Sequence, residues 1–335
     1  MSLRALAVTV AVTAAGAVLA TPATADPLPP SCTWTAHQVQ PPAGYYPNYT
    51  SVAGTDSHGT WSGVALTQLG RSPVVVTWTA DNQPKVVKEL NDFTWPYVAD
   101  ENSAGTILVS GSKIGGDGTS VTLYGTHDGA RTDLTPPAGY LFDSGVALNE
   151  RGDVLARGHG KDDNRPVSLY WSNLAAAPIV VDSPYGTGTD LDDDGTILLD
   201  DKSGNPAHLW RHGETTALPG TAPLNFEAIR NGTVVGYQPL EEFPKGQALL
   251  WDGGPAPRQI DGGGSARAIN ATGLIAGIRD SVYGTYGKPG IWQGTTFVAD
   301  LPVPSGGGTR ENFVVGDDNS VFVSTSTGPI RWTCS

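Results

Sequence analysis

The residues best suited to chemistry in this sequence are a run of carboxylates near its centre. Asp190, Asp192 and Asp194 occupy alternate positions, Gly195 follows them, and Asp201 stands at the twelfth position of the run. This spacing matches a calcium-binding loop, in which carboxylate oxygens converge on one ion and glycine permits the sharp turn. Aspartate is also a common residue in ordinary turns. Two interpretations therefore stay open: a calcium site formed by the four aspartates, or a hairpin without an ion.

Motifs for other kinds of catalysis are weak in this chain. It contains no Gly-x-Ser-x-Gly nucleophile motif. Its six histidines lack metal-ligand spacing. Adjacent acidic pairs such as Glu241-Glu242 are typical of solvated surface. A glycosidase could still take its two carboxylates from separate segments, and sequence alone does not select such a pair. We therefore predict no catalytic residues.

Aromatic residues in variable segments are the candidate ligand-binding residues. Such side chains can stack on a sugar ring or anchor a protein partner, and the competing interpretation is that they pack against the scaffold. The candidates are Trp61, Trp95, Tyr45, Tyr46, Tyr283 and Tyr286.

Other aromatic residues recur at regular intervals and indicate the elements that must position these candidates. Their spacing is 39 to 47 residues, a period typical of propeller blades and of helical arrays. With 43 glycines and 26 prolines, long helices are disfavoured. Because four of the eight recurring aromatics directly follow Leu or Ile in similar strands, we expect the set to pack between repeats. They are Trp34, Trp78, Tyr124, Trp171, Trp210, Trp251, Trp292 and Trp332.

Each repeat contains an apolar segment, a short Asn/Asp-rich turn that usually ends in Gly, and a second β-rich segment. The clearest example is Ala268-Ile-Asn-Ala-Thr-Gly-Leu-Ile-Ala-Gly277. After a variable loop, the repeat continues with an aromatic strand such as Ala248-Leu-Leu-Trp251. Asn and Gly in the turn favour a tight hairpin. A fourth short strand follows the aromatic strand, so the repeat predicts a four-stranded antiparallel sheet, the blade of a β-propeller.

These repeats resemble the bacterial extracellular repeat family called HAF, whose units read roughly A-x-x-I-N-x-x-G-x-I-x-G followed later by A-F-L-W. The match is carried by Ala266 to Gly277 and by Ala248 to Trp251. The resemblance implies an extracellular repeat protein, and it brings no catalytic residue set.

The ends of the repeat region predict how the ring is completed. The turn recurs seven times, whereas the segment from Cys32 to Gln40 resembles the end of a unit and the segment from Gly328 to Cys334 lacks a fourth strand. We predict a seven-bladed all-β propeller of four-stranded antiparallel blades, with the ring closed by the N-terminal strand joining the last blade. A disulfide between Cys32 and Cys334 would lock that strand pair, since two cysteines in an exported protein usually pair.

The first 25 residues have the features of a secretory signal peptide. Arg4 precedes an apolar run from Ala5 to Ala20, and Ala23-Thr-Ala25 fits a cleavage site. The remaining residues 26–335 are predicted to form a single propeller domain. With 33 acidic and 20 basic residues, the chain has a net charge of −13, which disfavours nucleic acid and anionic lipid. We expect a secreted monomer that neither spans nor binds a membrane.

Three functions fit these features, the third being a purely structural, wall-associated protein. The first is a secreted, non-catalytic propeller that presents a binding surface to an extracellular protein or carbohydrate, with calcium as its candidate cofactor. The second is a secreted glycan hydrolase or lyase with its active site at the propeller channel.

Overall fold

The computed structural model describes residues 32–334 except 68–71, 117, 173, 175–176, 222, 284–286 and 305–308, and for 310 and 311 it describes the backbone alone. The predicted signal peptide therefore lies outside the described residues. The regular secondary structure of the described chain is β-strand apart from two short 3₁₀ helices, η1 (Pro47–Tyr49) and η2 (Lys88–Leu90). None of its helices has the length and apolar character needed to cross a membrane.

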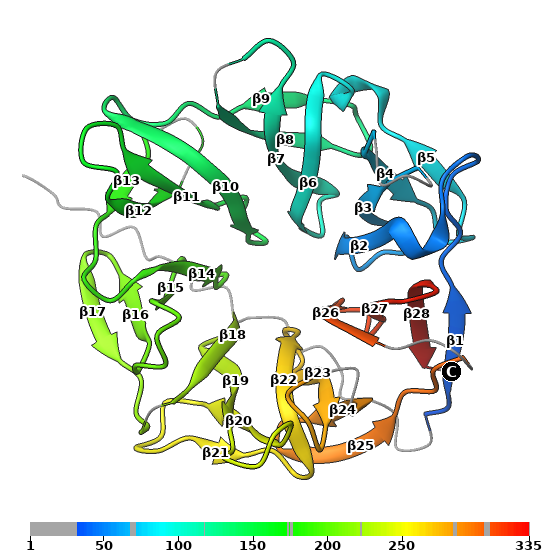
Figure 1. Ribbon diagram of the computed structural model, residues 1–335, viewed down its shortest axis with the longest axis vertical. Coiled ribbons are helices and arrows are strands. Elements are labelled where there is room, and N and C mark those ends of the chain that lie inside the picture. The colour runs from blue at the N-terminus through cyan, green and yellow to red at the C-terminus, as the bar shows by residue number, and fades with distance from the viewer. Residues whose placement is uncertain are drawn as a thin grey trace, which may run out of the picture.

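The strands form antiparallel sheets arranged around a central axis, as in a β-propeller (Figure 1). Four sheets of four strands follow the chain order: β2 (Thr50–Thr55), β3 (Trp61–Ala65), β4 (Val74–Trp78) and β5 (Pro84–Val86); β14 (Thr187–Leu191), β15 (Ile197–Asp200), β16 (His208–Arg211) and β17 (Glu214–Ala217); β18 (Asn225–Arg230), β19 (Thr233–Pro239), β20 (Gly246–Trp251) and β21 (Arg258–Gln259); β22 (Gly263–Ile269), β23 (Leu274–Arg279), β24 (Lys288–Gln293) and β25 (Thr296–Asp300). A fifth combines β26 (Thr309–Val315), β27 (Val321–Thr325) and β28 (Gly328–Cys334) with β1 (Trp34–Gln38).

The remaining strands form one eight-stranded sheet. It contains β6 (Phe93–Glu101), β7 (Thr106–Lys113), β8 (Thr119–Gly125), β9 (Arg131–Asp133), β10 (Tyr140–Leu148), β11 (Val154–Gly160), β12 (Pro166–Trp171) and β13 (Ile179–Val181). Its halves are joined where Phe142 of β10 pairs with Thr119 of β8. The prediction of seven separate four-stranded blades is therefore wrong: five sheets have four strands, and the sixth has eight.

The predicted role of the N-terminal strand also needs correction. The strand β1 does pair with β28, with Ala36 opposite Trp332, and it forms the outer edge of its sheet. It does not close the ring, because its pairing stays within that sheet. The first and last sheets meet instead by packing of β2 against β26 and β27. Trp61 and Phe322 illustrate this contact, with ring centroids 5.4 Å apart.

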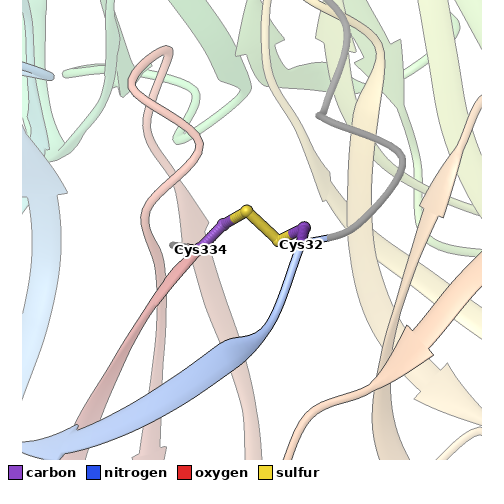
Figure 2. The surroundings of a disulfide bond; sticks show 2 residues. All are labelled: Cys32 and Cys334. Carbon is purple, nitrogen blue, oxygen red and sulfur yellow. A yellow bond between two sulfur atoms is a disulfide. The ribbon is translucent and has the colours of Figure 1, made fainter.

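The predicted disulfide is present. Cys32 and Cys334 are bonded, and their Cα atoms are 5.4 Å apart although 302 positions separate them in the chain (Figure 2). The bridge ties β28 to the residues that lead into β1, at the periphery of the ring (Figure 1).

The recurring aromatic residues pack between sheets, as their strand context predicts. All eight are buried, and six of the seven core clusters join neighbouring sheets, whereas the cluster that contains Trp171 lies between the two halves of the eight-stranded sheet. Four of the indoles also donate a hydrogen bond to a backbone carbonyl 30 to 38 residues earlier in the chain, which attaches each aromatic strand to the connection that precedes its sheet. These indoles belong to Trp78, Trp251, Trp292 and Trp332.

The second glycine of the repeat also has a packing reason. A Cβ atom built on Gly236 would lie 2.0 Å from the carbonyl oxygen of Asn225, and one on Gly277 would lie 2.0 Å from that of Ser265. Both oxygens belong to the first strand of the same sheet, so only glycine lets the two strands approach this closely.

Candidate functional site

A cavity of about 450 Å³ follows the axis of the ring. Its wall is built by one strand of each four-stranded sheet, β2, β14, β18, β22 and β26, and by β6 and β10 of the eight-stranded sheet. We call these the inner strands. A β-bulge interrupts β2, β6, β10, β14, β18 and β22 at the same register, and each bulged residue lines the cavity. A bulge turns a side chain away from its regular direction. The bulged residues are Ala53, Ala99, Val146, Thr189, Glu227 and Arg267.

The two ends of this channel differ in chemistry. We call the end where the inner strands begin the mouth, and the end where they run into the Asn/Asp turns the turn end. Most of the large apolar side chains that are exposed belong to strand starts and loops at the mouth. They are Tyr46, Tyr49, Trp95, Tyr97, Ile114, Leu141, Tyr185, Leu240, Phe243 and Tyr283.

The six predicted ligand-binding aromatics fall into two groups. Trp95, Tyr46 and Tyr283 are exposed at the mouth, and Trp95 is 58% exposed. Trp61 is instead buried, because Phe322 packs against it and the Arg331 guanidinium covers its ring at 4.6 Å.

The two remaining candidates add nothing to the mouth. Tyr45 packs against the same core cluster as Trp61. Tyr286 lies outside the described residues. Sequence reasoning missed Tyr97 and Phe243, although Tyr97 stands two positions after Trp95.

At the turn end, the turn residues form a belt of hydrogen bonds between successive inner strands. The Asn102 side chain donates to the carbonyl of Asn149 at 3.2 Å, and Asn149 donates to the carbonyl of Asp192 at 3.0 Å. The Asp192 carboxylate in turn accepts the backbone N–H groups of Asn231 and Gly232 at 2.8 and 2.6 Å. Further round the ring, Asn231 donates to Ala271, Asn270 donates to Gly316, and Asp317 donates its N–H to Ser57. The repeated turn residue is thus a connector between sheets.

The structure does not bring the four aspartates of the predicted calcium loop together. Asp192 is occupied in the belt, and Asp190 binds the N–H groups of Leu191 and Ile229 from the channel wall. Asp194 pairs with Arg211 at 3.0 Å. Asp201 follows β15 at the mouth, the opposite end of that strand. No group of three or more acidic, histidine or cysteine side chains within the described ranges is placed to hold a metal ion. The hairpin interpretation accounts for the run, and the aspartates fit no calcium ion.

Two carboxylates in the channel wall form equivalent clamps between inner strands. Asp100 accepts the N–H groups of Glu101 and Leu148 at 2.8 and 2.9 Å, and Asp190 makes the corresponding pair of bonds. Enclosure by the channel raises the pKa of Asp100 to about 7 and that of Asp190 to about 6, against the backbone hydrogen bonds that lower them. Each of the two carboxyl groups therefore titrates near neutral pH.

Arg230 crosses the turn end of the channel. Its guanidinium lies 3.0 Å from Glu150, 3.1 Å from Asp193 and 3.5 Å from Asp317, carboxylates that follow three different inner strands. Burial alone would lower the pKa of Arg230, but these carboxylates raise it above its usual value. The arginine occupies the turn position that holds Asn or Asp in five other repeats and Gly316 in the last, and a charged residue at this position is the signal by which sequence reasoning could have found it.

Glu101 is a buried acid beside the channel. Only 5% of the residue is exposed, and neither carboxylate oxygen makes a hydrogen bond within the described structure. Burial raises its pKa to about 8, the Ser62 hydroxyl opposes that rise, and the Asp56 carboxylate adds to it. Glu101 is therefore protonated in the folded protein at neutral pH.

Cationic side chains lie nearer the mouth. Arg267 pairs with Glu227 at 2.8 Å, and Lys202 donates to the carbonyl of Phe226 and pairs with Asp200. Arg157 reaches from β11 to the neighbouring inner strand, where its Nε donates to the carbonyl of Gly188 at 3.0 Å. All three cations line the channel. The channel thus offers hydrogen-bond donors and acceptors along its length and aromatic rings at its mouth, an arrangement suited to binding a polar ligand.

These features define the chain as a β-propeller with a polar axial channel. No protein-family model matches the sequence, and no curated protein matches it significantly.

Solved structures show the same fold. The streptogramin B lyase structure matches with 10% identity over 90% of this chain and 98% of that chain, with a TM-score of 0.56. The β-propeller domain of the Trilobed protease from Pyrococcus furiosus matches with 12% identity over 86% and 94%, with a TM-score of 0.61.

Larger peptidases contain a similar propeller. The acylaminoacyl peptidase from Pyrococcus horikoshii matches with 10% identity and a TM-score of 0.59, over 83% of this chain and 49% of that chain. The present chain thus spans about half the length of that peptidase. At these identities the similarity establishes the fold and carries no activity over.

Proposed function

We propose that the protein is a secreted, non-catalytic β-propeller that binds an extracellular glycan or protein at the mouth of its channel. The observation that carries this proposal is the concentration of exposed aromatic side chains there. Trp95 and Tyr97 are 58% and 56% exposed on one inner strand, and Phe243 is 67% exposed near Tyr283. Exposed aromatic groups beside a polar cavity are typical of ligand-binding surfaces.

Sequence features support the extracellular setting of this proposal. The leader of residues 1–25, the disulfide and the resemblance to HAF repeats all fit an exported protein. The net charge of −13 disfavours nucleic acid and anionic membranes as partners. A monomer is sufficient for binding, because the inner strands of one chain build the whole channel wall.

Binding to a glycan array and to purified extracellular proteins tests the proposal. We expect Trp95→Ala and Tyr97→Ala to weaken binding at least tenfold, as loss of central aromatic contacts does at other interfaces. Ile179→Ala is the matched control, because Ile179 is equally apolar and 45% exposed but lies on the outermost strand β13, away from the mouth. If Trp95→Ala and Tyr97→Ala bound as tightly as the wild-type protein and Ile179→Ala, the proposed surface would be contradicted.

A second candidate function is a glycan hydrolase or lyase. It is favoured by Asp100 and Asp190, two channel carboxyl groups whose pKa values of about 7 and 6 suit proton transfer near neutral pH. The similar fold of the streptogramin B lyase structure adds support at the level of architecture. Both carboxylates already accept two backbone hydrogen bonds, which favours the clamp role. Product formation from a polysaccharide panel, lost in Asp100→Asn, would establish the enzyme instead.

A further inference from the structure

Among the arginines whose side chains are described, Arg157 alone has no acidic partner in the described part of the chain. The described residues place no carboxylate within 4.0 Å of its guanidinium, whereas every other arginine whose side chain is described forms an ion pair. Its Nε is bonded to the Gly188 carbonyl, and its two terminal nitrogens make no hydrogen bond to the described protein. Because Arg157 lines the channel, this guanidinium fork faces the space that a ligand would occupy.

The surroundings of Arg157 indicate what kind of ligand fits. Tyr97 also lines the channel and exposes more than half of its surface. Enclosure of its hydroxyl raises the pKa of Tyr97, Asp100 adds to the rise and Arg157 opposes it, so the three groups lie close together. An aromatic face beside a guanidinium provides a stacking surface next to an anion-binding group.

The charge of the channel limits the anion to a weakly charged one. Asp190 and Glu227 line the same cavity as Arg157, and Arg230 is already neutralised by three carboxylates. A phosphate dianion or a polyanion would meet these acidic groups and the acidic protein as a whole. A single carboxylate matches the fork of one arginine, which binds such a group through two parallel hydrogen bonds.

The size and lining of the channel favour a sugar over a folded protein surface. A volume of about 450 Å³ lies in the range of small-ligand sites. Asn312 and Lys202, both exposed, line it together with Glu227, and such donors and acceptors can satisfy the many hydroxyls of a sugar.

We infer that the channel binds an acidic sugar unit of the uronate type, with Arg157 holding the sugar carboxylate and Tyr97 stacking on the ring. This inference rests on the proposed binding function and specifies its ligand class. Neutral glycans lack the carboxylate, so they bind more weakly at this site.

Calorimetry with uronate trimers tests the inference. The probes are the trimers of galacturonate, glucuronate and mannuronate, and the methyl ester of each, which keeps the ring and removes the charge. We expect at least one acid trimer to bind and its ester to bind at least tenfold more weakly. Arg157→Gln should remove this preference, and Arg157→Lys should retain part of it because lysine keeps the charge without the fork. Circular dichroism melting verifies that each variant folds.

Arg165→Gln is the matched control, since Arg165 is an exposed arginine paired with Asp182 outside the channel. Unchanged acid preference in both folded Arg157 variants would overturn the inference. Binding of acid and ester alike, weakened in Tyr97→Ala, would overturn it while leaving the proposed binding function intact. Arg157-dependent binding of a short peptide through its terminal carboxylate, with no trimer bound, would replace the sugar by a peptide. No binding of any trimer, together with a blank glycan array and no protein partner, would overturn both proposals.

Discussion

Replacing Glu101 by glutamine should remove much of the pH dependence of stability. The folded protein raises the pKa of this buried acid from about 4.5 to about 8. A raised pKa means that the fold favours the protonated form, so the unfolded chain releases a proton between these two values. The stability that Glu101 contributes is therefore fully present below about pH 4.5 and is lost as the pH rises towards 8.

The magnitude follows from the size of the pKa shift. One pKa unit corresponds to about 1.4 kcal/mol, and because the titration is incomplete at both ends of the range, the wild-type protein should lose about 3.5 kcal/mol through Glu101 between pH 5 and pH 8. For a chain of this length, that loss corresponds to about 5 °C in melting temperature. Glutamine has nearly the same shape and no charge, although its amide donors also lack a partner in the buried site. The Glu101→Gln protein should accordingly be less stable than wild type at pH 5 and more stable at pH 8.

Urea denaturation followed by tryptophan fluorescence, repeated at half-unit steps from pH 5 to pH 8, measures this difference. The quantity of interest is the gap between the two stability curves, because other titrating groups contribute equally to both. Glu214→Gln is the control, since Glu214 is exposed on β17 and should leave the curve unchanged. Parallel curves for the wild-type and Glu101→Gln proteins would refute the argument that Glu101 is buried without a partner.

Three further predictions concern the belt, the channel and the disulfide. Asp192→Ala should lower the free energy of unfolding by about 2 kcal/mol, equally in calcium and in EDTA, because it removes the acceptor of buried N–H groups; a loss that appears in calcium alone would restore the metal site. Arg230→Met should cost about 3 kcal/mol by leaving three carboxylates unpaired, whereas Arg211→Met, which breaks one exposed ion pair, should cost under about 1 kcal/mol in the same urea titration. Cys32→Ser should lower stability by on the order of 5 kcal/mol at most, and a melting temperature equal to that of the wild type would show that the bridge adds nothing.

Features that depend on the repeat were predictable from the sequence. The aromatic period identified the fold because every sheet needs a large side chain at the same place between neighbours, and the Asn/Gly turns marked the hairpins. The cysteine pairing followed because its two residues flank segments that complete one sheet. The aromatic residues and the turns were predictable because the same packing requirement recurs in every repeat. The disulfide was predictable because the two segments that it joins can be recognised as parts of one sheet.

Features that depend on contacts between different repeats were not predictable. The joining of the eight-stranded sheet rests on Thr119 and Phe142, which no repeat position marks. Trp61 was expected at a binding surface, but Phe322 from the far end of the chain covers it. Arg157 reaches a neighbouring inner strand whose bulge places Thr189 in the channel, and bulges leave no simple pattern in the sequence.

The belt at the turn end has a consequence for how such a ring could change in evolution. Asn102, Asn149 and Asn270 each donate to a backbone carbonyl of the following repeat, and every repeat supplies a carbonyl whatever its side chains. After a repeat was duplicated or deleted, the Asn side chain could therefore form the same hydrogen bond with a backbone carbonyl of its new neighbour. Arg230 differs, because its partners are particular side chains in three other repeats. Connections to backbone carbonyls thus tolerate exchange of the neighbouring repeat, whereas the arginine ties its own repeat to the present neighbours.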